Sequence, residues 1–253
     1  MKHLSVLLTT LSTVVVSAIS ISAISESATA ANFSGNSSGI WGNPNPGINQ
    51  NPQTTGVGTN TFTWGRACLA GDINPCPQNA VFGTPPNKLT FNGSAFNTNI
   101  GSQFKIGNLS YFNGTVLEDT SVESVPLNLT VSFADIGITK NFDFRFLLHN
   151  TPNVGTPTEN ADYITVLNQV SEQTFFYQDK EYTLELTGFS EKNGFVNFFS
   201  VLEGEDTTAS IYGTIKQVIR PKTIPEPGAI AGLSVLGIYL LCRRQNFSRS
   251  RGN

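Results

Sequence analysis

LNLTVSF at residues 127–133 and FDFRF at residues 142–146 are the stretches that decide the fold. In both, apolar residues occupy every second position and polar residues lie between them. A period of two places alternate side chains on opposite faces of a β-strand. Both stretches therefore predict strands with one face toward a core and the other toward solvent.

Similar strand patterns recur along the chain, separated by residues that favour turns. The dipeptide Gly107-Asn108 is typical of a hairpin turn. No amphipathic helix of ten residues or more is evident between the two ends. The sequence therefore predicts an all-β domain, an antiparallel β-sandwich of jelly-roll-like type. Further strands are expected at residues 59–64, 88–91, 103–106, 109–112, 163–167, 173–177, 181–189, 194–202 and 209–218.

We expect the β-sandwich outer domain to cover residues 59–220. The preceding segment, 32–58, is rich in Gly, Asn, Ser and Pro. Such a composition favours turns and open loop over helix. Residues 32–58 are accordingly expected to be a separate N-terminal segment.

The composition excludes some partners. Charged residues make up 13% of the chain, against the roughly 25% usual in soluble domains. Residues 31–227 hold ten basic and 17 acidic residues, for a formal charge of −7. An acidic domain repels the phosphates of nucleic acids, so no nucleic-acid partner is expected.

The N-terminal end has the pattern of a secretory signal peptide. Lys2 precedes an uncharged run of apolar and small hydroxyl residues at 4–24, and Ala28-Thr29-Ala30 follows at the spacing that signal peptidase recognises. We expect a signal helix in residues 1–31, removed by signal peptidase after Ala30 or Ala31. An uncleaved anchor helix is the alternative.

The C-terminal end has three parts in order. A linker at 221–227 ends in Pro225, Glu226 and Pro227; residues 228–253 then form an apolar run followed by Arg243, Arg244 and further arginines. The apolar run of about 15 residues is shorter than the ~20 that span a bilayer comfortably. We expect a hydrophobic helix in the inner membrane, with the arginines on the cytoplasmic side.

These three parts together resemble the PEP-CTERM sorting signal, over about 28 residues. The resemblance implies recognition and cleavage near the motif by an exosortase, with Pro225, Glu226 and Pro227 as recognition residues. It also implies a Gram-negative bacterium, such as a cyanobacterium, that makes exopolysaccharide. A plain tail anchor with a chance Pro-Glu-Pro is the alternative.

The outer domain has a resemblance of its own, to the choice-of-anchor K domain, a bacterial extracellular module found with several surface anchors. This similarity covers roughly residues 37–219 and implies an extracellular location without implying an activity. The motifs that carry it are GIWGNP (39–44), GTNTFTWG (58–65), FDFRF (142–146), TPN (151–153), AD (161–162) and YTLELTGF (182–189).

Cys68 and Cys76 are eight positions apart in the outer domain. In an oxidising compartment such a pair favours a small-loop disulfide. A free pair of thiols and a metal site are the alternatives. A zinc site would need two more ligands, and His149 is the only histidine outside the signal peptide.

Two further sets of residues are candidates for ligand binding. Asn153, Glu159 and Asp162 supply oxygen atoms of the kind that calcium prefers, in a loop that otherwise reads as a turn. Trp41 and Trp64 could stack on a sugar ring if exposed, although strand aromatics more often lie in the core. Calcium is the only cofactor considered, and only as a structural ion.

The chain offers weak grounds for catalysis. A nucleophile pair of His149 with a cysteine lacks any flanking signature. A glycosidase needs two carboxylates at a particular separation. Glu181 and Glu185 share one face of a predicted strand, but carboxylates exposed to solvent on a strand are the more ordinary explanation. No catalytic residue is therefore assigned, and the protein is not expected to be an enzyme.

The sequence as a whole predicts an exported protein. The C-terminal helix would anchor it in the membrane before processing, and it would then reside in the cell envelope, at the cell surface or outside the cell. A non-enzymatic structural or adhesive β domain is the leading expectation. The alternative is a carbohydrate-binding module for exopolysaccharide.

Overall fold

The computed structural model describes residues 32–72, 76–77, 79–191 and 194–220. The predicted signal peptide (1–31), the linker (221–227) and the hydrophobic helix with its basic tail (228–253) lie outside these residues. Every regular element in the described ranges is a β-strand. Among these residues there is no helix with the length and apolar character needed to cross a membrane.

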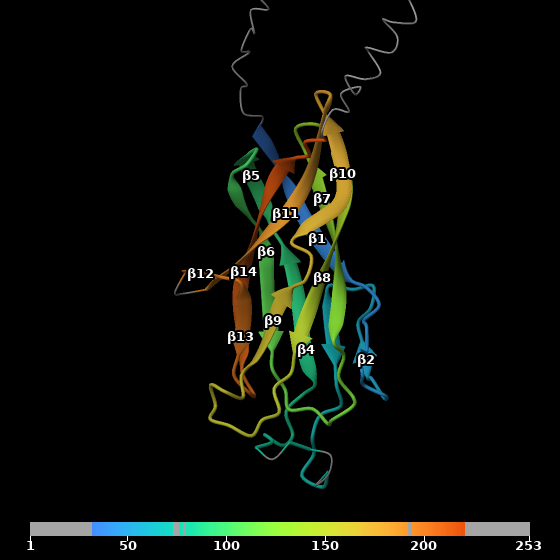
Figure 1. The fold of residues 1–253 in the computed structure, drawn as a ribbon, viewed down its shortest axis with the longest axis vertical. Coiled ribbons are helices and arrows are strands. Elements are labelled where there is room, and N and C mark those ends of the chain that lie inside the picture. Colours follow the sequence, from blue (N-terminus) through green and yellow to red (C-terminus); the bar gives the residue numbers. More distant parts are fainter. Residues whose placement is uncertain (1–31, 73–75, 78, 192–193, 221–253) are drawn as a thin grey trace, which may run out of the picture. The chain divides into compact units, whose positions relative to one another are not determined.

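The strands form two curled antiparallel sheets in a sandwich-like arrangement, which confirms the all-β prediction (Figure 1). The six-stranded sheet has the spatial order β13 (Phe198–Val201), β9 (Asp162–Val166), β8 (Ile138–His149), β7 (Ser124–Phe133), β1 (Asn32–Trp41) and β5 (Ala95–Asn99). The eight-stranded sheet has the order β10 (Val170–Tyr177), β11 (Lys180–Glu191), β14 (Asp206–Gln217), β6 (Gln103–Phe112), β4 (Asn87–Gly93), β3 (Thr61–Trp64) and β2 (Thr54–Thr55), with β12 (Gly194–Val196) paired to β11.

The alternation that predicted the first two strands is borne out in β7 and β8. Leu127 pairs with Phe144, and Leu129 with Phe142, and all four side chains are buried. The intervening polar residues lie on the outer face. One face of this strand pair is buried and the other faces solvent. A shift of the pairing by one residue would expose the apolar side chains, so the register is fixed.

The core between the sheets is largely aromatic. Phe33 is its hub, with ring centroids 5.5 Å from Phe133 of the same sheet and 5.9 Å and 6.0 Å from Phe175 and Tyr182 of the other sheet. All of these contacts are edge-to-face, the geometry that aromatic pairs favour. Edge-to-face contacts of this kind fill the space between the two sheets with aromatic side chains.

The prediction of open loop for residues 32–58 is wrong for its first ten residues. Asn32–Trp41 is strand β1, inserted between β7 and β5. Its small residues are required by close packing: a Cβ on Gly35 would collide with the carbonyl oxygen of Ser132. A composition typical of loops therefore reflects tight strand pairing here. Most of the remainder, residues 42–58, is turn and loop, with the two-residue strand β2 inside it.

Two other expectations are corrected. Gly107-Asn108 makes no hairpin, because β6 runs without interruption from Gln103 to Phe112. Gly107 instead lies at a register shift against β14, where a Cβ would meet the ring of Phe91. The strand expected at 194–202 is divided, since β12 pairs with β11 and β13 pairs with β9 in the other sheet.

The described domain has two distinct ends. At one end, Asn32 begins β1 opposite Asn99, and the nearby Gly101 amide donates to the carbonyl of Ile215 in the last strand. The start of β1 and the end of β14 therefore lie at the same end of the domain (Figure 1). The opposite end, called here the loop end, consists of the described residues of the connections at 66–84, 113–123, 150–161 and 202–205.

Candidate functional site

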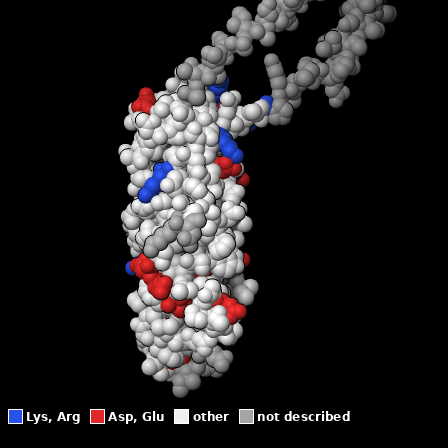
Figure 2. Space-filling model, turned by 90° about the vertical axis from the view of Figure 1, so that its left-hand side faces the viewer, with Lys and Arg blue, Asp and Glu red and all other residues white. Residues whose placement is uncertain are grey.

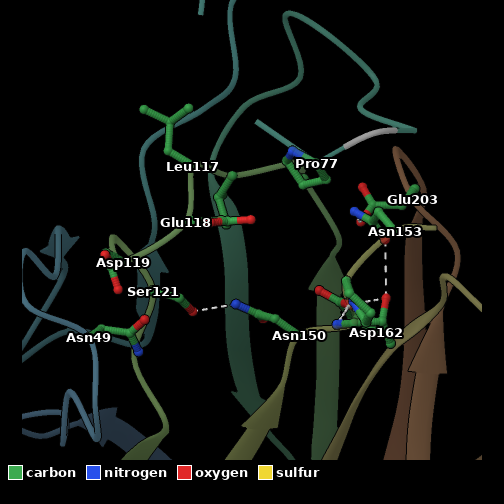
Figure 3. A pocket seen from close by; sticks show the side chains of 14 residues that line it. Asn49, Pro77, Leu117, Glu118, Asp119, Ser121, Asn150, Asn153, Asp162 and Glu203 are labelled. Atoms are coloured by element: carbon green, nitrogen blue, oxygen red, sulfur yellow. Dashed lines mark hydrogen bonds between the residues drawn. The ribbon is translucent and has the colours of Figure 1, made fainter. Parts of the chain in front are cut away.

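A cavity of about 260 Å³ opens at the loop end (Figure 3). Glu118 and Asp119 lie on one side of it, and Asn153, Asp162 and Glu203 on the other. These residues come from three separate connections and from the first position of β9. The cavity therefore depends on the tertiary fold rather than on one local motif.

Asp162 is buried and receives several hydrogen bonds. The Thr151 amide donates to its Oδ1 at 2.7 Å, and the Tyr111 hydroxyl donates to its Oδ2 at 3.4 Å. Burial raises the pKa of Asp162 to about 7, and the nearby Glu203 carboxylate acts in the same direction, while the bonds from Thr151 and Tyr111 lower it. The carboxyl group thus titrates near neutral pH.

Glu203 links two other connections. Its Oε1 accepts a hydrogen bond from the side-chain amide of Asn153 at 2.5 Å, and its Oε2 accepts one from the Thr115 hydroxyl at 2.7 Å. Desolvation raises the pKa of Glu203, and these two hydrogen bonds oppose the increase. Each carboxylate oxygen therefore has a donor from the protein itself.

These contacts define what the site can do chemically. All four carboxylate oxygens of Asp162 and Glu203 accept hydrogen bonds that join segments far apart in the sequence. The hydrogen bonds of these two acids hold the loops together, and both acids bind protons more readily than usual.

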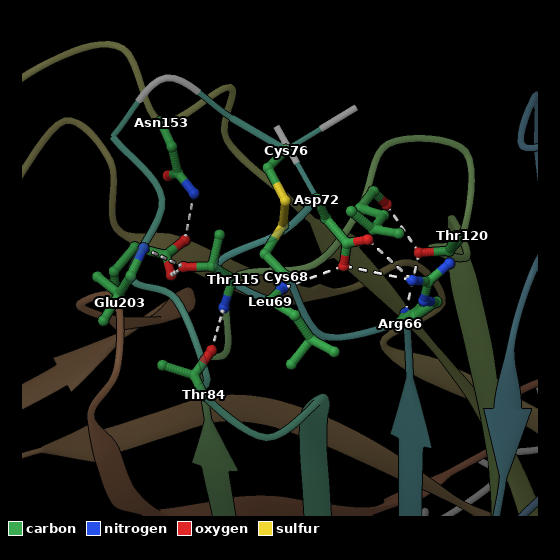
Figure 4. The surroundings of a disulfide bond; sticks show 12 residues. Arg66, Cys68, Leu69, Asp72, Cys76, Thr84, Thr115, Thr120, Asn153 and Glu203 are labelled. Atoms are coloured by element: carbon green, nitrogen blue, oxygen red, sulfur yellow. Dashed lines mark hydrogen bonds and ion pairs between the residues drawn. A yellow bond between two sulfur atoms is a disulfide. The ribbon is translucent and has the colours of Figure 1, made fainter. Parts of the chain in front are cut away.

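The disulfide predicted for Cys68 and Cys76 is present, with Cα atoms 5.9 Å apart. It lies between two polar contacts (Figure 4): the hydrogen bonds to Glu203 on one side and the Arg66–Asp72 ion pair, at 3.0 Å, on the other. Cys68 itself is fully buried. The disulfide therefore secures the longest connection at the loop end.

The predicted calcium ligands do not converge. Thr151 joins two of them, since its hydroxyl lies 3.1 Å from Oδ1 of Asn153 and 3.2 Å from Oδ1 of Asp162. Glu159 is used elsewhere, because its carboxylate accepts bonds from the amide and hydroxyl of Thr156. In the described ranges, no three His, Cys, Asp or Glu side chains are grouped to hold a metal ion.

The expectation that Trp41 or Trp64 could stack on a ligand is wrong. Both side chains have 0% exposure. The Trp41 indole donates to the carbonyl of Asn60 at 3.0 Å, and Trp64 stacks between Phe62 and Tyr111. Both rings are inward-facing strand residues, the ordinary place for aromatic side chains.

The residues weighed for catalysis lie in separate places. His149 is on the outer face of β8 and stacks on Tyr163 with centroids 4.4 Å apart. Glu181 binds Arg220 at 2.6 Å, and Glu185 binds Lys216 at 2.5 Å, both from the outer face of β11. None of them lines the cavity at the loop end.

Sequence reasoning missed the contributions of Tyr111, Thr115 and Glu203. Tyr111 lies in a strand that the sequence predicts at 109–112, but its partner Asp162 is 51 residues away. Glu203 lies in a turn without a local signature. The sorting residues Pro225, Glu226, Pro227, Arg243 and Arg244 lie outside the described residues.

The fold and site define a disulfide-containing, all-β domain whose loop end is held by the buried Asp162 and the half-buried Glu203. Comparison with known proteins adds no name to this class: no protein-family model matches the chain, and no curated protein matches it.

Proposed function

We propose that this protein is exported and sorted to the cell envelope by an exosortase that acts on its C-terminal tail. The observation that carries the proposal is the order of features in the sequence: a signal peptide at 1–31, then Pro225-Glu226-Pro227, an apolar run and terminal arginines. The inner membrane would hold the tail before processing. The protein would then reside in the envelope, at the surface or outside the cell.

Two features of the described domain support this proposal. Its disulfide is of the type that persists in oxidising compartments and is rare in the cytosol. Arg220, the last described residue, makes a two-pronged contact with Glu181 at 2.6 and 2.7 Å. This contact ties the chain to β11 five residues before Pro225, so the motif would follow closely on the folded domain.

We further propose that the domain is non-enzymatic and acts as a structural or adhesive module of the envelope. Its interior is filled by aromatic side chains, and the Asp162 and Glu203 carboxylates at the loop-end cavity accept hydrogen bonds from the protein itself. The passage of the chain between sheets, as at β12 and β13, supports the jelly-roll-like class. The likeness to the choice-of-anchor K domain is part of the same proposal.

Intact mass of the protein from native cells tests the sorting proposal. We expect a species that lacks about the first 30 residues and the segment after the Pro-Glu-Pro motif. A species that retains Arg243 to Asn253 would identify a plain tail anchor and overturn the role of an exosortase.

A matched pair of variants makes the test specific. Glu226→Ala changes the motif, whereas Lys222→Ala changes a linker residue four positions earlier. The first variant should accumulate as the unprocessed form in the membrane fraction, and the second should be processed like the natural protein. Equal processing of both would show that the motif is not what the processing enzyme recognises.

A further inference from the structure

We propose that the outer face of the six-stranded sheet, along β13, β9 and β8, binds a neutral oligosaccharide. Tyr163 and Phe198 would pack against the sugar rings, and Asp143 and Arg145 would hydrogen-bond to their hydroxyl groups. This inference goes beyond the envelope role proposed above. It depends on that role only because the location of the protein determines which glycans it encounters. We call this surface the outer strip.

The first part of the outer strip is aromatic. Tyr163 and Phe198 point outward with 36% and 51% of their surface exposed, and their ring centroids are 5.9 Å apart. His149 stacks on one face of the Tyr163 ring. The residue paired with Tyr163 on its other side is Ser200, whose side chain is small, on the edge strand β13. Because Phe198 meets Tyr163 edge-to-face, at an interplanar angle of 69°, the exposed parts of the two rings together form an apolar surface for a ligand.

The middle of the outer strip is uncharged. Phe198 pairs with Thr165, which pairs in turn with Leu147 on β8. Leu167 follows on the same outer side, 59% exposed, with its amide bonded to the carbonyl of Arg145 at 2.8 Å. On the one face that Figure 2 shows, Lys, Arg, Asp and Glu side chains cover only a small part of the surface. Leu147, Thr165 and Leu167 thus connect the rings to the next feature along the sheet.

The far part of the outer strip is a cavity of about 370 Å³ lined by Asp143, Arg145, Leu167, Glu172 and Gln173, among others. The Arg145 guanidinium donates to the Ser124 hydroxyl at 3.1 Å, and Gln173 donates to Oδ2 of Asp143 at 3.1 Å. Within the described part of the chain, the remaining guanidinium N–H groups, Oδ1 of Asp143 and the Glu172 carboxylate have no hydrogen-bond partner.

The spacing of the two parts favours a ligand longer than one sugar ring. Tyr163 and Val166 are three residues apart on β9, which is about 10 Å at the usual rise of a strand, and Leu167 at the cavity follows Val166. The Tyr163 ring and the polar cavity are therefore too far apart for a monosaccharide to contact both. An oligosaccharide lying along the strands could contact both.

The chemistry of the outer strip matches a saccharide. A sugar ring has an apolar C–H face, which suits an aromatic ring, and neighbouring hydroxyls, which suit planar groups that donate or accept in pairs. A concave site with apolar walls and a few convergent polar groups is the usual form of a small-ligand site. The formal charge of −7 on residues 31–227 disfavours an anionic glycan, so the occupant is a neutral one.

Strand addition by a second copy of the chain is the competing use of this edge. β13 contains only four residues, which offers few ladder hydrogen bonds to an added strand. The exposed features of the outer strip are side chains on its face rather than a long free backbone. The face, and not the edge, is therefore the binding element.

Calorimetric titration tests the proposal with the full chain, purified in a detergent without a sugar headgroup. The probes are α- and β-linked hexasaccharides of glucose, mannose and galactose, with a hexasaccharide of uronic acid as the charged comparison. At least one neutral hexasaccharide should bind. Tyr163→Ala should weaken that binding roughly tenfold or more, and Tyr163→Phe should largely preserve it because the ring remains.

Two other variants keep the test decisive. Glu172→Gln changes an exposed cavity residue and should weaken binding, whereas Thr130→Ala, on the same outer face at β7, should not. Binding of no neutral hexasaccharide overturns the proposal. Unchanged binding in the double variant Tyr163→Ala with Phe198→Ala would also overturn it. Tighter binding of the uronic acid hexasaccharide than of the neutral ones would overturn it as well. None of these results bears on the mass test of sorting.

Discussion

The hydroxyl of Tyr111 donates a hydrogen bond to Oδ2 of Asp162 across 3.4 Å, and this bond joins the two sheets. Tyr111 belongs to β6 of the eight-stranded sheet and Asp162 to β9 of the six-stranded sheet. Burial raises the pKa of both groups, and their mutual repulsion when charged adds to the increase for the tyrosine. The tyrosine therefore keeps its proton and donates it to the hydrogen bond, which favours the ionised carboxylate, while the larger effect of burial favours the protonated one.

This relationship predicts that Asp162 makes the domain less stable as the pH rises toward neutral. The folded pKa is about 7, whereas an unfolded aspartate titrates near ~3.9. Between those values the folded state holds a proton that the unfolded state has released. The contribution is therefore present below about pH 4 and is lost as the pH rises through about 7, with a total of roughly 4 kcal/mol.

Asp162→Asn provides the matched comparison, because an amide oxygen can still accept the bond from Thr151 but does not titrate. Urea unfolding at about pH 4.5 and about pH 8 measures the effect. The natural protein should lose more stability between these conditions than the variant does. An identical loss in both proteins would assign the pH dependence to other groups.

Trp41→Phe is predicted to destabilise the domain without changing glycan binding at the outer strip. The substitution removes the indole bond to the carbonyl of Asn60 and part of a fully buried ring. Lost packing and the lost hydrogen bond together should cost about 1–3 kcal/mol, although the Asn60 carbonyl keeps its bond from the Phe91 amide. Urea unfolding checks the loss, and hexasaccharide titration of the same variant checks binding. A large change in affinity with unchanged stability would return Trp41 to the list of ligand contacts.

Strand β1 shows a limit of predicting secondary structure from amino-acid composition. The alternation in residues 127–133 and 142–146 was decisive because each inward residue of these stretches is apolar and each outward residue is polar. In β1 the same geometry is filled by Gly and Ser, which pattern reasoning assigns to loops. The need for small residues arises from the approach of the neighbouring strands, as at Gly35, and a single sequence does not contain that information.

The cavity at the loop end was partly predictable. Asn153 and Asp162 were singled out because oxygen-bearing residues gather in one loop, and the structure places both at the cavity. Their partner Glu203 is 41 residues beyond Asp162 in the chain. Only the pairing of β13 with β9 brings it near. The sequence therefore identified Asn153 and Asp162 from their closeness in one loop. The position of Glu203 depends on the order of the strands in the sheet.

Removal of the disulfide should loosen the loop end more than the sheets. A loop of eight residues' separation is short, so its closure contributes about 2–3 kcal/mol. In the double variant Cys68→Ala with Cys76→Ala, limited proteolysis should cut first within residues 66–84. The Arg66→Ala variant, which removes only the ion pair to Asp72, should resist such cleavage. Equal resistance of both proteins would show that the hydrogen bonds alone hold this connection.

Gly35→Ala tests directly whether residues 32–41 are a strand of the sheet. A Cβ at this position would overlap the carbonyl oxygen of Ser132, so β1 could not keep its register with β7. The loss should reach about 3 kcal/mol or more, the range seen when backbone pairing or core packing is forced apart. Ser38→Ala, at an exposed position of the same strand, should change stability by less than about 0.5 kcal/mol. Urea unfolding of the two variants separates the outcomes: similar small effects would mean that this segment is not paired as described, whereas a large loss confined to Gly35→Ala would place it inside the sheet.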